Sequence, residues 1–249
     1  MHILMYHLVD DAVTDPMSVP LHRFRDQMTL LAEHYTVLTE ADLHQILASG
    51  IQPPDRSVLL TFDDGYTNTI TTVLPVLEQH GLPAVMAVCG GYLTTDLPRR
   101  TPHVVDQMAD LAEVRRWLET GRTVAAHSYT HQRLTTATDL GLSWQVLGDR
   151  EALTELLGAP PATFVYPYGA YDLRVQRMVA RVYPLAMATD EHHCVDLSHP
   201  YSLPRIQVDP SWSLTAFQAA LDSDTDPATA QHRARRVDTA ADRTSGVSR

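Results

Sequence analysis

The hexapeptide Thr61-Phe62-Asp63-Asp64-Gly65-Tyr66 decides how the rest of this 249-residue chain is interpreted. An apolar run, 57–60, leads directly into it and is typical of a buried strand. Two adjacent carboxylates therefore follow a strand, at the end where α/β proteins usually place their chemistry. Neighbouring aspartates also repel each other unless a cation or a shared proton compensates. The alternative is that Asp64-Gly65 is only a turn dipeptide.

A pair of histidines, His127 and His131, follows a second apolar run at 123–126. On a helical turn, or in a tight loop, two imidazoles at this spacing can face the same ion, as they do in many zinc sites. Asp64 would complete a His-His-carboxylate set and leave positions open for water and substrate. Because the chain has 13 histidines, a chance pair is the alternative. The matching position after a strand favours a shared site.

Apolar strands alternate with amphipathic helices along the chain. We expect strands over 3–6, 35–38, 57–60, 84–89, 123–126, 162–166, 185–188 and 203–208. We expect helices over 21–34, 40–49, 69–80, 104–120, 140–157, 173–182 and 213–221. The segments 10–20 and 92–103 are predicted loops. About seven strand–helix units favour a closed or nearly closed parallel α/β barrel, with an open doubly wound sheet as the alternative.

Composition narrows the class of protein. The formal net charge of -11 argues against general nucleic-acid binding. No apolar run is long enough to span a membrane, and the first residues lack the pattern of a signal peptide, so we expect a cytoplasmic location. Residues 1–221 are predicted to form one domain, and 222–249, poor in large apolar residues, a disordered tail. The oligomeric state stays open.

Three motifs occur together: TFDDGY at 61–66, HSYTH at 127–131 and YPYG at 166–169. Their order and separations resemble the polysaccharide deacetylase family, the NodB-homology domains of carbohydrate esterase family 4. The resemblance covers residues 1–221, and Met5-Tyr6-His7 is similar to the start of the subgroup with poly-N-acetylglucosamine deacetylases. It implies a distorted (β/α)7-type barrel in a single domain.

The resemblance also implies roles for single residues. Asp63 would be the general base that takes a proton from the attacking water. The backbone N–H of Tyr168, in the turn after Pro167, would help to bind the oxyanion. The ion would be zinc, with cobalt, nickel or manganese as alternatives. Its implied ligands are Asp64, His127 and His131.

The chain departs from the family pattern at two positions. Many members have an arginine where this chain has Val165, and a Leu-x-His motif where this chain has Leu203-Pro204-Arg205. The general acid is therefore unassigned. His7 is the first candidate, and its alternative role is a hydrogen-bond partner of Asp63 or of the metal ligands. Arg205 is grouped with the substrate and oxyanion residues, either orienting a carboxylate or remaining a surface charge.

These features lead us to expect a metal-dependent hydrolase that removes the acetyl group from an N-acetylated amino sugar. Because no leader is seen, a small glycoside or biosynthetic intermediate is expected before a wall polymer. Two alternatives stay open: hydrolysis of a cyclic amide or ureide on the same scaffold, and a carbohydrate-binding protein whose catalysis has decayed. The segment 90–103 is expected to shape the substrate site.

Overall fold

The computed structural model describes residues 1–11, 16–94, 97–99, 106–189, 195 and 197–222. The predicted tail beyond residue 222 and much of the predicted loop 92–103 lie outside the described residues. None of the described helices is long and apolar enough to cross a membrane.

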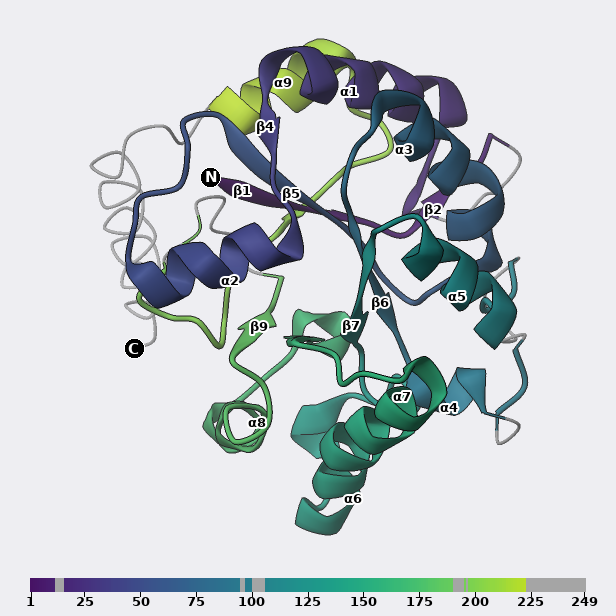
Figure 1. Ribbon diagram of the computed structural model, residues 1–249, viewed down its shortest axis with the longest axis vertical. Coiled ribbons are helices and arrows are strands. Elements are labelled where there is room, and N and C mark those ends of the chain that lie inside the picture. Colours follow the sequence, from purple (N-terminus) through teal and green to yellow (C-terminus); the bar gives the residue numbers. More distant parts are fainter. Residues whose placement is uncertain (12–15, 95–96, 100–105, 190–194, 196, 223–249) are drawn as a thin grey trace, which may run out of the picture.

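A parallel sheet organises the described part of the chain (Figure 1). Its strands run in the order β10-β1-β5-β6-β7-β8-β9, and the short β4 pairs with the start of β5. Their bounds are β1 His2–Tyr6, β4 Thr36–Val37, β5 Ser57–Phe62, β6 Val85–Val88, β7 Thr123–Ala126, β8 Thr163–Val165, β9 Leu185–Met187 and β10 Ile206–Gln207.

The segment that carries β10 nearly closes the sheet into a ring. Leu203 forms a parallel bridge with Met187 of β9, while Ile206 pairs with Leu4 of β1. One stretch of backbone thus reaches from the last strand to the first. The sheet is curled and barrel-like, and the predicted barrel is confirmed over the open doubly wound sheet.

Helices surround the strands (Figure 1). They are α1 Leu21–His34, α2 Glu40–Ser49, α3 Leu74–His80, α4 Gly90–Leu93, α5 Leu111–Glu119, α6 Asp139–Ser143, α7 Asp149–Leu157, α8 Leu173–Val179 and α9 Leu214–Asp222. A π-helical turn, Thr69–Val73, leads into α3, and another, Trp144–Gly148, joins α6 to α7. Pro75 lies in the first turn of α3, at the boundary that its missing N–H predicts.

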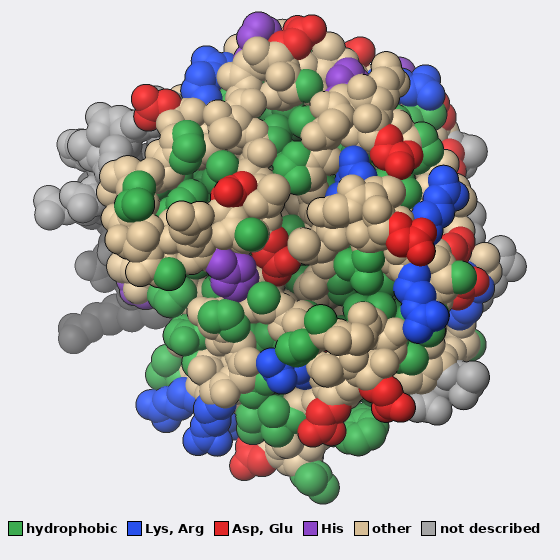
Figure 2. Space-filling view, in the orientation of Figure 1, with side chains coloured by type: hydrophobic (Ala, Val, Ile, Leu, Met, Phe, Trp, Pro, Cys, Tyr) green, Lys and Arg blue, Asp and Glu red, His purple; other side chains and the backbone are tan. Residues whose placement is uncertain are grey.

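The core has two layers because each strand buries both faces. One cluster fills the barrel interior and includes Leu59, Val165 and Met187. Leu43 of α2 belongs to this interior cluster, and the α2 side chain of Glu40 accepts a hydrogen bond from Thr163, the first residue of β8. Helix α2 therefore covers the amino ends of the strands. Figure 2 shows acidic and basic side chains interspersed on the face of the molecule seen in Figure 1.

Two sequence-based expectations were wrong. The helix expected over 104–120 begins only at Leu111, because Asp110 accepts from the Glu113 N–H and Glu113 from the Asp110 N–H, which fixes the start. Before it, Met108 forms an antiparallel bridge with Tyr66. The expected loop 10–20 ends in a strand, β3 (Ser18–Val19), which pairs with β2 (Leu8–Val9).

Candidate metal centre and active site

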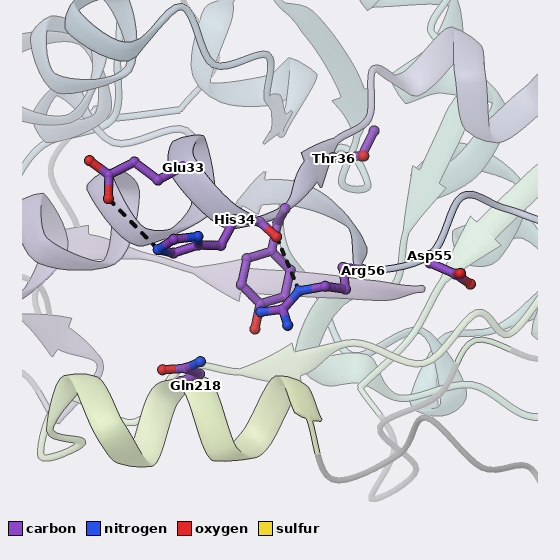
Figure 3. A pocket seen from close by; sticks show the side chains of 7 residues that line it. Glu33, His34, Thr36, Asp55, Arg56 and Gln218 are labelled. Carbon is purple, nitrogen blue, oxygen red and sulfur yellow. Dashed lines mark hydrogen bonds and ion pairs between the residues drawn. The ribbon is translucent and has the colours of Figure 1, made fainter.

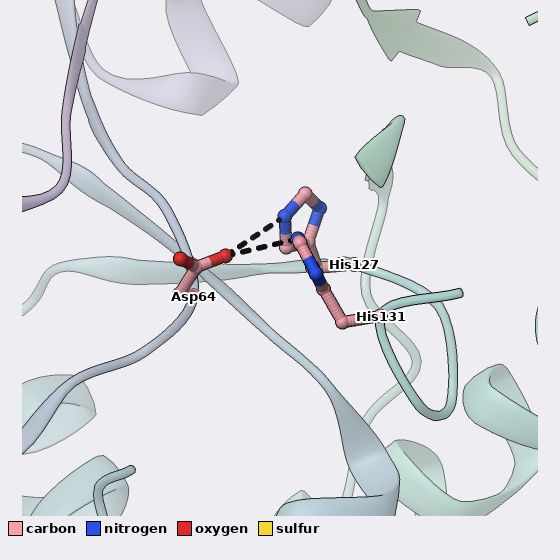
Figure 4. A group of neighbouring side chains, drawn as sticks. All are labelled: Asp64, His127 and His131. Atoms are coloured by element: carbon pink, nitrogen blue, oxygen red, sulfur yellow. Dashed lines mark ion pairs between the residues drawn. The ribbon is translucent and has the colours of Figure 1, made fainter. Parts of the chain in front are cut away.

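Three side chains from distant parts of the chain converge just beyond the carboxyl ends of β5 and β7. Asp64 Oδ1 lies 3.4 Å from His127 Nε2 and 3.1 Å from His131 Nε2. The three ligand atoms lie within 4.8 Å of one another. Figure 4 shows the carboxylate pointing toward both imidazoles. The two histidines occupy a tight loop, which was one of the two geometries expected from their spacing.

The contacts behind these atoms fit a bound cation. His127 Nδ1 donates to the carbonyl oxygen of Val165 at 2.8 Å, which leaves Nε2 free to be a ligand. The Tyr66 hydroxyl donates a hydrogen bond to Asp64 Oδ2, with the two oxygens 2.7 Å apart. Asp64 Oδ1 is buried without a hydrogen bond in the described part of the chain. An orphaned carboxylate oxygen between two imidazole nitrogens fits a divalent metal, and two nitrogens with one oxygen suit zinc.

The charges at this cluster favour the ionised carboxylate. Burial would raise the pKa of Asp64, but the imidazoles of His127, His131 and His7 hold it well below its ordinary value. Burial would likewise lower the pKa of His131, but the Asp64 carboxylate, with Asp63 behind it, raises it. Asp64 is therefore a ready anionic ligand at neutral pH.

Asp63 forms a buried two-point ion pair with Arg205. Arg205 Nη1 and Nη2 each lie 2.7 Å from one carboxylate oxygen of Asp63. The same guanidinium donates to the Ala188 carbonyl and the Thr61 hydroxyl, so its side chain, 0% exposed, is fully engaged. Burial would raise the pKa of Asp63, but the charge and hydrogen bonds of Arg205 lower it. Arg205 therefore orients this carboxylate and is not a surface charge.

This pairing explains one departure from the family pattern. Val165 belongs to the apolar barrel interior, so β8 offers no guanidinium to Asp63. Arg205 arrives instead from the segment that bridges β9 and β1. A guanidinium is thus supplied to Asp63 from the residue just before β10 and not from β8.

The backbone is strained around this cluster. Four non-glycine residues here have positive φ: Asp64 at 70°, Ser128 at 64°, His131 at 55° and Tyr168 at 60°. Such conformations cost about 1–3 kcal/mol each and concentrate at functional sites. Position 65 requires glycine for two reasons: its φ is 68°, and a Cβ there would lie only 2.8 Å from Val88 Cγ1. The fold supports these strained turns with its packed core.

Tyr168 lies at the rim of the cluster, in the turn after Pro167. The residue is 59% exposed, and its ring centroid lies 4.7 Å from that of the His131 ring. Among the described residues its backbone N–H has no acceptor. That donor is therefore free to bind a substrate oxygen.

This combination of a parallel barrel and an Asp-His-His cluster occurs in a known family. The family model described as polysaccharide deacetylase matches residues 50–186, which include all three motifs. The chain belongs to the polysaccharide deacetylase family.

Named members of this family are similar over most of the chain. YxkH of Bacillus subtilis, whose name places it among polysaccharide deacetylases, is 24% identical over 89% of this chain and 76% of its own. The poly-beta-1,6-N-acetyl-D-glucosamine N-deacetylase of Escherichia coli is 26% identical over 86% of this chain, which spans only 37% of that protein.

Solved structures confirm the deacetylase fold. The Streptococcus pyogenes deacetylase PplD, in complex with acetate, superimposes with a TM-score of 0.78, at 22% identity over 89% of this chain and 97% of that one. IcaB from Ammonifex degensii superimposes with a TM-score of 0.74, at 21% identity over 88% of this chain and 94% of that one. Since these identities are low, they establish the fold alone.

His7 lies between β1 and β2, half-buried beside the deacetylase motif. Its position is fixed on both sides, because Asp63 N donates to the Tyr6 carbonyl and the Asn68 side chain holds both backbone groups of Val9. His7 contributes to the lowered pKa of both aspartates. No hydrogen bond joins it to either one in the described part of the chain, so its imidazole is available to a substrate.

Two residues that the sequence did not single out support the histidine loop: Gln145 binds it directly, and Asp149 binds the start of α4, which contacts the loop through Gly91. Gln145 accepts from the Thr130 N–H at 3.0 Å and donates to the Thr130 hydroxyl at 2.8 Å. Buried Asp149 accepts from the Gly90 N–H at 2.7 Å, and burial raises its pKa to about 8. Gln145 and Asp149 are four residues apart, a helical spacing that is visible in the sequence. That spacing alone did not indicate either of these contacts.

A groove of about 610 Å³ lies away from this cluster, between the end of α1, β4 and α9 (Figure 3). Its groups are engaged with one another: Glu33 lies 3.8 Å from His34, and Arg56 donates to the His34 carbonyl. Tyr35 donates to Asp222 at the end of α9. None of the motif residues lines it, so we assign it to the attachment of α9 and not to catalysis.

Proposed function

We propose that this chain is a divalent-metal-dependent N-deacetylase that hydrolyses the acetamide of an N-acetylated amino sugar, with zinc as the ion. The observation that carries the proposal is the free Oδ1 of Asp64 between two imidazoles, with oriented Asp63 next to it in the chain. Family membership supports this reading, and so do relatives named as deacetylases of N-acetylglucosamine polymers and of chitooligosaccharides.

The proposal assigns the ion to three residues. Asp64, His127 and His131 would hold it and leave further positions open. A divalent ion held there would polarise the acetamide carbonyl and acidify a nearby water. The phenol of Tyr66 and the carbonyl of Val165 keep the ligand atoms aimed at one point.

The remaining residues move protons and stabilise charge. Asp63, ionised at neutral pH because its pKa is lowered, accepts the proton of the attacking water as oxygen adds to the acetamide carbon. The Tyr168 N–H donates to the oxygen that gains negative charge. The C–N bond then breaks, and His7 supplies the proton that the leaving amine nitrogen needs. The products are acetate and the free amine.

Asp63→Asn is the test of this mechanism. The amide keeps the size of the side chain but cannot accept the proton, so acetate release should fall by about 10²-fold or more. Zinc content should stay near one ion per chain, since Asp63 is no ligand. A variant that keeps full turnover would contradict the assignment.

A substrate panel separates the remaining alternatives. Acetate release from N-acetylglucosamine oligomers would support the deacetylase, whereas turnover of cyclic amides or ureides alone would replace it. Binding of oligomers by wild-type protein without acetate release would leave only the carbohydrate-binding alternative. Comparing monosaccharide glycosides with polymers tests the expected preference for small substrates. The cytoplasmic location stays a prediction.

A further inference from the structure

Arg133 stands at the mouth of the candidate site, two residues after the metal ligand His131. Its guanidinium carbon lies 4.7 Å above the centroid of the Tyr168 ring. That ring centroid is itself 4.7 Å from the His131 ring centroid. The cation is therefore two ring contacts away from the proposed metal centre. Both Arg133 and Tyr168 are exposed, so both can be reached by a ligand.

Arg133 differs from other arginines on nearby segments in having no partner for its charge. Arg99 lies 2.8 Å from Glu113, and Arg174 lies 3.0 Å from Asp139. Within the described ranges, Arg133 has no carboxylate at ion-pair distance, and its side chain makes no hydrogen bond. Its cation–π contact with the Tyr168 ring is the interaction that the structure shows for this side chain.

This arrangement prepares the guanidinium to bind an anion. A cation–π contact is worth about 0.5–1 kcal/mol at an exposed site, enough to favour one orientation of the side chain. The planar fork then offers parallel N–H donors that match the two oxygens of a carboxylate or a phosphate. In a chain with a net charge of -11, an unpaired cation at the mouth of the site also attracts an anionic substrate to that place.

We infer that Arg133 selects substrates that carry an anionic group, a carboxylate or a phosphate, close to the N-acetylated sugar that is hydrolysed. The Tyr168 ring orients the guanidinium, and its backbone N–H would donate to the substrate oxygen as proposed above. This inference rests on the proposed deacetylase activity and names the substrate class that the activity prefers.

Two matched pairs of probes test it by acetate release. The carboxylate pair is a hyaluronan tetrasaccharide, in which N-acetylglucosamine alternates with a uronic acid, and its neutral methyl ester. The phosphate pair is N-acetylglucosamine 1-phosphate and the neutral methyl N-acetylglucosaminide. Comparing the two pairs distinguishes a carboxylate from a phosphate as the recognised group.

Wild type should show a higher kcat/KM for the anionic member of at least one pair. Arg133→Gln should lower kcat/KM for that anion by about tenfold, the scale of one charge-assisted hydrogen bond, and change its neutral partner less than about twofold. Arg133→Lys should recover only part of the loss, since an ammonium keeps the charge without the stacked fork. The loss should appear mainly in KM, because Arg133 does not touch the reacting atoms.

Arg116→Gln is the matched control. Arg116 is exposed on α5, its side chain makes no hydrogen bond or ion pair in the described part of the chain, and its replacement changes the net charge equally. Arg116→Gln should leave kcat/KM unchanged for all four probes. Equal turnover of anionic and neutral probes by wild type, or equal losses in both Arg→Gln variants, would overturn the selectivity but leave the deacetylase intact. If wild type released acetate from none of the four probes, both the selectivity and the proposed deacetylase activity would be overturned.

Discussion

At the scale of single residues, the site depends on contacts one step behind the reacting groups. The ligand atoms of Asp64 and His127 are aimed by a phenol and a backbone carbonyl, and Asp63 is aimed by a guanidinium. None of these supporting groups would touch the substrate. They still decide the chemistry, because a ligand or base that can rotate loses the geometry on which rate and affinity depend.

Tyr66→Phe should weaken zinc binding by about 10–100-fold, the usual effect of removing a partner behind a ligand. The substitution leaves Asp64 Oδ2 buried without its donor. Competition with a chromophoric chelator measures the affinity. Tyr183→Phe is the control, because the Tyr183 hydroxyl is buried without a hydrogen bond among the described residues. Equal zinc affinities in the two variants would show that the Tyr66 hydroxyl does not support Asp64.

Arg205→Lys should lower kcat and move the acidic limb of the pH–rate profile to higher pH. Arg205 lowers the pKa of Asp63, so a weaker, single-point contact lets that pKa rise. The base is then ionised only at a higher pH than in wild type. The profile of kcat/KM against pH measures this shift. If kcat fell but the acidic limb of the profile stayed at the same pH, a group other than Asp63 would set that limb.

At the scale of elements, the two ends of the barrel have different tasks. The proposed metal ligands follow the carboxyl ends of β5 and β7, while the amino end of β8 is joined to α2. There Thr163 donates to Glu40 and lies 3.1 Å from His44 Nε2, which is itself 3.9 Å from Glu40 Oε1. This small polar cluster attaches α2 over the interior, so stability and chemistry are separated along the strands, as in other barrels.

Thr163→Val should lower the free energy of unfolding by about 1–3 kcal/mol, because it leaves buried Glu40 without its donor. Values of kcat/KM should not change, since the substitution lies at the far end of the barrel. Thr123→Val is the matched control: its hydroxyl, at the start of β7, is buried without a partner in the described structure. Urea denaturation compares them. A loss of activity in Thr163→Val, measured where the variant is still fully folded, would contradict the separation of stability from chemistry.

At the scale of the whole molecule, the metal would join parts of the chain that are about sixty residues apart. Asp64 follows β5, while both histidines follow β7, with β6 between these strands in the sheet. A shared ion therefore cross-links strands that are not neighbours. Binding to the folded state alone stabilises it by mass action.

Zinc at 100 times its dissociation constant should add about 2.7 kcal/mol to the free energy of unfolding, and chelation should remove it. Thermal melts with zinc at that free concentration or with EDTA measure the shift. Asp63→Asn should keep the shift, while Asp64→Asn should lose most of it. Identical shifts in both variants would place the ion elsewhere.

The sequence by itself determined the alternation of strands and helices and the three motifs, whereas the strand count only favoured the barrel that the family resemblance implied. These depend on local apolar periodicity, on Gly and Pro positions, and on spacings that one segment carries alone. The capped start of α2, at Thr39 with Asp42, and its end at Gly50 were likewise readable from neighbouring residues.

Only the tertiary structure decided which groups support the site. Arg205 meets Asp63, and Asn68 holds Val9, across long separations in the chain. Arg133 meets Tyr168 in the same way. The pairing of β2 with β3 and the bridge between Tyr66 and Met108 also depend on partners outside the local segment. Such contacts follow from how the barrel closes, and no local pattern encodes them, because each partner alone is compatible with many surroundings.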